Sequence, residues 1–123
     1  MFKDGVKANN LLQRLNGTKY LIKGNHDRFI EEETFIQNNF KWIRDYYVLN
    51  YQRNKIVLFH YPIVEWDGYF KDTIHLHGHV HNCIRNADQK KRVSVLGKKA
   101  VNVGVDVNDF KPISIERILK MTE

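Results

Sequence analysis

The sequence predicts an α/β fold in which mixed sheets are flanked by helices. Apolar residues recur at helical spacing over residues 6–15. Residues 56–59 are apolar on both faces, as in a central strand, and residues 73–77 alternate apolar and polar side chains, as in a strand with two unlike faces. With 123 residues, 42% of them hydrophobic, the chain can bury one core, so we expect a single domain over residues 1–123.

The first half of the chain predicts two helices and a strand. The first helix ends at Asn16-Gly17, because glycine readily adopts the left-handed conformation that follows a helix. Residues 19–23 predict a short strand, followed by a loop at residues 25–27. Asp27 would then cap a second helix that runs to about residue 38, with acidic residues in its first turn.

The second half predicts mostly strands. Residues 42–51 and 55–59 are rich in aromatic and β-branched side chains, which indicates a hairpin that turns at residues 52–54. An aromatic loop then leads to the strand at residues 73–77. The remaining predicted elements are a last strand pair at residues 93–96 and 100–105, and a closing helix at residues 114–121.

Four of the six histidines fall within residues 75–81, at every second position. Gly78 ends the strand, and in extended chain the Cα atoms of His79 and His81 would lie about 6–7 Å apart on one side. Two imidazoles at this separation can bind one metal ion, or two ions about 3.5–4 Å apart. The alternative is four ordinary histidines on a solvated edge, but their clustering at a strand end favours a metal site.

Polar side chains follow three of the predicted strands: Asn25 and His26 after the first, His60 after the second, and His79 and His81 after the third. In open sheets with helical crossovers, ligand sites form beyond the carboxyl ends of the strands. We therefore expect these side chains to converge.

Three motifs follow one another along the chain: Gly24-Asn25-His26-Asp27, the lone His60, and Gly78-His79-Val80-His81. Together they resemble the motifs of the calcineurin-like metallophosphoesterases, and the resemblance covers residues 19–105. The segment from Asn102 to Asp106 also resembles the strand that follows in bacterial members. A metallo-β-lactamase-type His-x-His-x-Asp-His motif fits less well, because it would need an aspartate where this chain has His79.

The resemblance implies a metal-dependent phosphoesterase that hydrolyses phosphomonoesters or phosphodiesters with two divalent ions. It implies that Asn25, His60 and His79 bind one ion and that His81 binds the other. Nitrogen and oxygen ligands of this kind suit manganese, iron, zinc or nickel.

The resemblance also implies two catalytic residues. His26 would contact the phosphate or protonate the leaving oxygen, and Asp27 would hold the other ring nitrogen of His26. Capping of a helix by Asp27 is an equally good interpretation. His75 and His77 match no family ligand, which indicates a packing or supporting role. Asn102 and Asp106 would border the site or simply form a strand-end turn.

The family pattern begins with Asp-x-His on a first strand and Gly-Asp-x-x-Asp after a second, and the chain contains neither motif. The resemblance therefore implies a truncated α/β/β/α sandwich whose first two strands are missing, as if the true protein started further upstream. It also implies an incomplete dinuclear site, with three protein ligands for one ion and His81 alone for the other. We expect one bound ion or none, because a single imidazole in water scarcely binds a metal.

Two functional hypotheses follow from this incomplete site. The first is a phosphoesterase that is weak or inactive as this chain. The second is a non-catalytic module, derived from the same fold, that binds phosphate, nucleotide or a partner protein. In both cases the missing strands would leave an unpaired sheet edge, which predicts a homo-oligomer.

Composition limits the location and the partners. The chain has no apolar run near the 18 or so residues of a membrane span, no apolar signal-peptide core, and a single cysteine, Cys83. These features predict a soluble, cytoplasmic protein in a reducing compartment. The formal net charge of +6 attracts anions such as phosphate esters or nucleic acid. Nucleic acid fits less well, because the basic run at residues 90–92 has no aromatic side chain to stack on a base.

Overall fold

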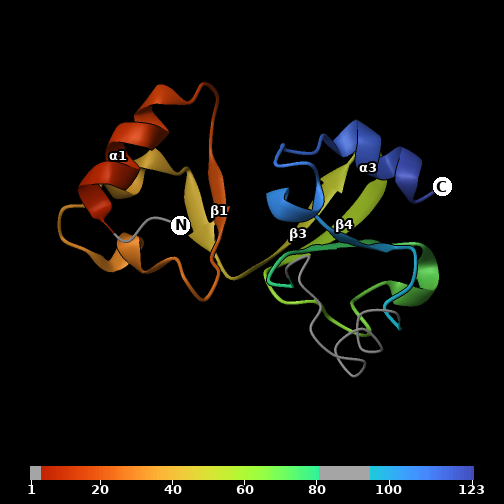
Figure 1. The fold of residues 1–123 in the computed structure, drawn as a ribbon. Coiled ribbons are helices and arrows are strands. Elements are labelled where there is room, and N and C mark those ends of the chain that lie inside the picture. The colour runs from red at the N-terminus through yellow and green to blue at the C-terminus, as the bar shows by residue number, and fades with distance from the viewer. Residues whose placement is uncertain (1–3, 81–94) are drawn as a thin grey trace. The chain divides into compact units, whose positions relative to one another are not determined.

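The computed structural model describes residues 4–80 and 95–123 and confirms an α/β fold with mixed sheets and helices (Figure 1). The chain divides into two compact units, Met1–Asp45 and Tyr46–Glu123. Each unit contains a sheet, a helix and its own cluster of buried apolar residues. The prediction that both belong to one domain stays a prediction.

The first unit packs one helix against a two-stranded parallel sheet. The side chain of Asp4 caps the helix by accepting a hydrogen bond from the Val6 backbone N–H at 2.8 Å. The buried cluster of this unit is formed by Ala8, Leu12, Phe29, Ile30, Phe35 and Phe40. In chain order its elements are the helix α1 (Gly5–Arg14), the strand β1 (Tyr20–Ile22), the short 3-10 helices η1 (Arg28–Glu31) and η2 (Gln37–Asn39), and the strand β2 (Trp42–Arg44).

The predicted second helix over residues 27–38 is wrong, since this segment forms only the two 3-10 turns η1 and η2. The reason lies in the spacing of its apolar residues. Phe29, Ile30 and Phe35 are all buried in the same cluster. On a continuous helix, Phe35 would fall off the face that carries Phe29 and Ile30, whereas Glu33 would fall on it. Burial of the three apolar side chains therefore excludes a regular helix.

The second unit is built on a four-stranded sheet of order β3-β4-β5-β6. β3 and β4 form an antiparallel hairpin, whereas β4, β5 and β6 are mutually parallel neighbours. In chain order its elements are β3 (Tyr46–Tyr51), β4 (Asn54–Phe59), the 3-10 helix η3 (Tyr69–Lys71), β5 (Ile74–His77), β6 (Ala100–Asn102), the 3-10 helix η4 (Val105–Val107) and the helix α3 (Ile115–Met121).

The predicted hairpin is confirmed in its turn and corrected in its first arm. Tyr51 pairs with Asn54, so the turn consists of Gln52 and Arg53, both with positive φ (46° and 67°). This is the backbone that a two-residue hairpin turn requires. Residues 42–44 belong instead to β2 and pair with β1, so the chain changes sheets at Asp45.

The predicted last strand pair is also corrected. β6 pairs in parallel with β5, with Leu76 opposite Val101. Of the other predicted arm, residues 95–96 form a turn, and residues 93–94 lie outside the described part of the chain. The closing helix is confirmed as α3, whose Ser114 cap accepts a hydrogen bond from the Arg117 backbone N–H at 3.2 Å.

The two faces of the four-stranded sheet differ in chemistry. One face is aliphatic, with Ile56, Ile74 and Val101 packed against Ile118 of α3. The other face carries His75 and His77, which are both buried. Since β4 and β5 are parallel, their carboxyl ends lie at the same edge of the sheet.

None of the helices within residues 4–80 and 95–123 is long and apolar enough to cross a membrane.

A matched pair of glycines tests the packing of the β4–β5 connection. Gly68 and Gly97 share a φ of +81°, but a Cβ atom on Gly68 would overlap the Thr73 hydroxyl, whereas one on Gly97 would meet nothing within 4 Å. We expect Gly97→Ala to lower the free energy of unfolding by about 1–2 kcal/mol, the cost of a left-handed L-residue. Gly68→Ala should cost clearly more, because Thr73 is β-branched and buried. Urea denaturation measures both, and equal losses would contradict the packing described here.

Candidate metal site

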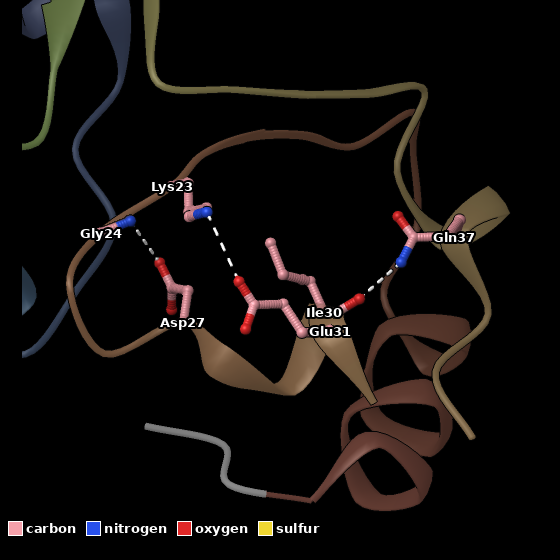
Figure 2. A network of polar contacts seen from close by, with 6 residues as sticks. All are labelled: Lys23, Gly24, Asp27, Ile30, Glu31 and Gln37. Carbon is pink, nitrogen blue, oxygen red and sulfur yellow. Dashed lines mark hydrogen bonds and ion pairs between the residues drawn. The ribbon is translucent and has the colours of Figure 1, made fainter. Parts of the chain in front are cut away.

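The Gly24–Asp27 turn is closed by its own aspartate (Figure 2). Asp27 Oδ2 accepts a hydrogen bond from the Gly24 backbone N–H at 2.8 Å, and the Asp27 N–H donates to the Gly24 carbonyl at 3.3 Å. Asp27 makes no side-chain cap to η1, so its role as a helix cap is wrong. Asn25 and His26 are exposed at the tip of the turn, immediately beyond β1. The orientation of His26 by Asp27 stays a prediction.

Hydrogen bonds, more than charge, support this turn. The ion pair between Lys23 Nζ and Glu31 Oε1 spans 3.8 Å between exposed side chains, so it contributes little (Figure 2). Gln37 Nε2 donates to the Ile30 carbonyl at 2.6 Å, which ties the two 3-10 helices together. The chain after Asp27 is therefore fixed by contacts within the first unit.

His60 and His79 form a close pair at the carboxyl edge of the four-stranded sheet. His60 follows β4, and Gly78 follows β5, its N–H donating to the His60 carbonyl at 2.9 Å. This backbone bond places the two histidine side chains together, with His60 Nε2 and His79 Nδ1 3.2 Å apart. The ring centroids are 5.1 Å apart.

The nitrogen separation fits shared coordination of one ion. Two imidazole nitrogens that each lie about 2.0–2.1 Å from a metal, at angles of about 90–109°, are about 2.8–3.4 Å apart. The 3.2 Å between His60 and His79 falls in this range. Without an ion, one nitrogen donates a hydrogen bond to the other, so the pair is held in the same arrangement.

Tyr61 packs against both imidazoles. Its ring centroid lies 4.9 Å from that of His60 and 4.7 Å from that of His79. Phe59 extends the ring cluster, with its ring centroid 5.7 Å from that of Tyr61. These contacts restrict rotation of the two histidine rings.

His79 sits in a strained turn. Its φ is +67°, a left-handed conformation that is uncommon for a residue with a side chain. The Val80 N–H donates to the Gly78 carbonyl at 2.8 Å, which closes a three-residue turn around His79. Such strain persists only where the surroundings enforce it.

Asn102 enforces this turn from the neighbouring strand. Its Nδ2 donates to the Val80 carbonyl at 2.6 Å, and its Oδ1 accepts from the Gly104 N–H at 2.9 Å. Next to it, the Val103 N–H donates to the His77 carbonyl at 2.9 Å. Asn102 therefore borders the candidate site by anchoring the turn that carries His79.

His75 is fully buried and both of its ring nitrogens are engaged. The Ile63 N–H donates to His75 Nε2 at 3.0 Å, so this nitrogen carries no proton. The proton therefore lies on Nδ1, which donates to the Val57 carbonyl at 3.0 Å. Burial lowers the pKa of His75, and the neighbouring His77 lowers it further, while the carbonyls of Val57 and Tyr61 act in the opposite sense.

His77 is a second buried histidine on the same face of the sheet. Its Nδ1–H donates to the Gly78 carbonyl at 3.1 Å, and its ring centroid lies 5.4 Å from that of His75. Burial also lowers the pKa of His77, with the hydrogen bond to Gly78 opposing the shift. Both rings are buried, as the packing or supporting role that the sequence indicated requires.

Of the predicted ligands, the structure brings His60 and His79 together. His81 lies outside the described residues, as does Cys83. Asn25 belongs to the first unit and the histidine pair to the second, so their convergence stays a prediction. Within residues 4–80 and 95–123, no three His, Cys, Asp or Glu side chains group as metal ligands. The observed part of the site is therefore a two-histidine pair.

Sequence reasoning indicated Asn102 and His75 near the site but missed the backbone groups that these two side chains bind. The bonds of Asn102 to Val80, and of His75 to Val57 and Ile63, join segments 12 to 22 residues apart. Two features of the sequence could have indicated these contacts: His75 lies on the inner face of a buried strand, and Asn102 lies at the end of a strand.

Comparison with known proteins gives relatives without an assigned activity. No protein-family model matches the chain. It is 32% identical over 117 residues to an uncharacterized protein of Methanocaldococcus jannaschii, MJ1445, an alignment that covers 95% of this chain. The chain spans 57% of the length of that relative. The crystal structure of a protein of unknown function from Aquifex aeolicus, AQ665, matches with a TM-score of 0.68 and 28% identity, over 98% of this chain and 70% of that one.

The buried neutral His75 predicts a loss of stability in mild acid. Its pKa in the folded protein is lowered from the ordinary value of 6.5, so the unfolded chain binds more protons as the pH falls below that value. The free energy of unfolding should therefore fall below about pH 6.5, by at most about 1.4 kcal/mol per pH unit for each such group.

The measurement is urea denaturation between pH 7.5 and 5 in the presence of a chelator. His75→Gln should show a smaller pH dependence than the parent, and Ile74→Val, which removes a methyl group on the other face of the sheet, should keep the parent's slope. A His75→Gln variant with an unchanged slope would contradict the prediction.

Proposed function

We propose that this protein is a metal-dependent phosphoesterase of the calcineurin-like metallophosphoesterase type, with an incomplete dinuclear site that is weak or inactive as this chain. The observation that carries the proposal is the His60–His79 pair, whose nitrogens lie 3.2 Å apart at the carboxyl edge of parallel strands. The ordered motifs of the sequence support it. So does the tight turn that leaves Asn25 and His26 exposed beyond β1.

In this proposal His60 and His79 bind one divalent ion. The family resemblance adds the amide oxygen of Asn25 as a third ligand and leaves His81 alone for a second ion, so we expect one bound ion or none. Manganese, iron, zinc or nickel suits these ligands. A bound ion would supply positive charge that offsets the negative charge developing on the phosphoryl oxygens. His26 donates a hydrogen bond to the phosphate or a proton to the leaving oxygen. Asp27 shapes the turn that presents His26.

The alternative function is a non-catalytic module that binds phosphate, nucleotide or a partner protein through the same loops. The observation that favours it is that, in the part of the chain that the structure describes, no third acidic, histidine or cysteine side chain groups with His60 and His79 as a metal ligand. A two-histidine site holds an ion less tightly than one with three or four protein ligands. This alternative predicts metal or phosphate binding without turnover, and a cytoplasmic location suits both functions.

Substitutions of single histidines separate these functions. We expect His79→Ala and His60→Ala to weaken binding of Mn²⁺ by at least about tenfold, since each removes a direct ligand. His26→Ala is the matched control: it should leave Mn²⁺ affinity unchanged and lower turnover by about 10²–10⁴-fold. Titration calorimetry with Mn²⁺ and hydrolysis of bis-p-nitrophenyl phosphate measure the two effects.

The outcomes distinguish the hypotheses. Mn²⁺ binding that depends on His79 but gives no hydrolysis would favour the non-catalytic module. Unchanged Mn²⁺ binding and hydrolysis in His79→Ala would remove this histidine from the site.

The sheet also suggests a homo-oligomer. β3 is an outer strand of the four-stranded sheet and is six residues long, so it can pair with a second copy. We expect light scattering after size-exclusion chromatography to give a dimer, and Tyr46→Lys, which adds a charge to this strand, to shift the protein toward monomer. A monodisperse monomer over the accessible concentration range would rule out this interface.

A further inference from the structure

His60 lies at the start of a long crossover between two parallel strands. The chain leaves β4 at Phe59 and enters β5 at Ile74, and the crossover contains one short 3-10 helix, η3. Parallel strands are usually joined through an α-helix, which holds its own backbone by internal hydrogen bonds. This crossover lacks that support, so other contacts must fix the position of His60.

His75 provides such contacts on both sides of His60. Its Nδ1–H donates to the carbonyl of Val57, three residues before His60, and its Nε2 accepts from the N–H of Ile63, three residues after it. One rigid, fully buried ring thus joins the last part of β4 to the beginning of the crossover. The two bonds bracket the residue that meets His79.

The ring of His75 is itself fixed in place. The Trp66 ring lies 5.3 Å from it, and Trp66 Nε1 donates to the Thr73 carbonyl at 2.7 Å. Trp66 is 4% exposed, so the middle of the crossover is folded back over His75. Because packing prevents the ring of His75 from rotating, the ring fixes the positions of the backbone groups to which it is hydrogen-bonded.

We propose that His75 is a positioning residue that holds His60 against His79 in the ion-binding geometry. The inference rests on the proposed function only in treating the His60–His79 pair as a metal site. It assigns to His75 a specific task beyond packing: the bond to Ile63 fixes the direction in which the chain leaves His60.

Two amide side chains can test the two halves of this arrangement separately. The short amide of asparagine ends near the position of Nδ1 and can donate to the Val57 carbonyl. The longer amide of glutamine reaches toward the position of Nε2 and can accept from the Ile63 N–H. Leucine has a similar shape and makes neither bond. If the Ile63 bond positions His60, glutamine should rescue the site better than asparagine does.

The experiment compares Mn²⁺ affinity in His75→Leu, His75→Asn and His75→Gln by titration calorimetry, at a temperature where circular dichroism shows each variant folded. Removal of residues that orient metal ligands typically weakens binding about 10–100-fold. We expect a loss of this size for His75→Leu and His75→Asn, and a loss of less than about threefold for His75→Gln. Ile74→Val, on the aliphatic face, is the control that lowers stability without touching Val57 or Ile63, and it should bind Mn²⁺ as the parent does.

A second measurement does not require metal binding. In the chelated protein, nuclear Overhauser effects between the ring protons of His60 and His79 report their proximity directly. We expect these signals in the parent, in Ile74→Val and in His75→Gln, and their loss in His75→Asn and His75→Leu.

Each outcome decides the inference. Parent-like Mn²⁺ binding in a folded His75→Leu variant overturns it, as do equal affinities for the asparagine and glutamine variants. If His75→Leu does not fold, the asparagine–glutamine comparison decides. If the parent does not bind Mn²⁺, the proposed function fails at this site, and the ring-proton signals alone decide whether His75 positions His60.

Discussion

The parallel pairing of β4 and β5 is the constraint on which the candidate site depends. Leu58 lies opposite Leu76, so the chain two residues further along each strand places His60 beside Gly78. The bond from the Gly78 N–H to the His60 carbonyl continues the ladder past the last paired residues. A shift of register by one residue would exchange the two faces of β5 and separate the histidines.

The same register determines which side chains lie on each face of the sheet. Aliphatic residues fall on the face that packs against α3, and His75 and His77 fall on the other. A buried imidazole is tolerated only where its nitrogens find partners. His75 meets this condition through Val57 and Ile63, so the position cannot be filled by an arbitrary residue without leaving backbone groups unpaired.

Much of the fold could be predicted from local patterns. α1, the tight hairpin turn and α3 follow from spacing, turn residues and caps, all of which act within a few residues of the chain. The change of sheet at Asp45 and the parallel pairing of β6 with β5 could not be predicted, because an extended segment has the same alternation whichever strand it joins. The helix expected after Asp27 was predicted from a cap and from acidic residues, whereas the spacing of Phe29, Ile30 and Phe35, which are buried in one cluster, does not fit a helix.

The candidate site likewise has a part that could be predicted from local motifs and a part that depends on distant residues. Motifs and their order indicated His60 and His79, and their proximity follows from parallel strands. The contacts that support them, from Asn102 to Val80 and from His75 to Ile63, join side chains to distant backbone groups. A backbone N–H or carbonyl is the same in every residue, so its partner leaves no mark in the sequence.

The left-handed backbone of His79 has a consequence for protein engineering. Glycine and asparagine adopt this conformation at lower energy than histidine does. A library of variants selected for thermal stability alone would therefore be enriched in glycine and asparagine at position 79. The most stable variants would then lack the imidazole. Thermostability and ligand chemistry compete for this one position.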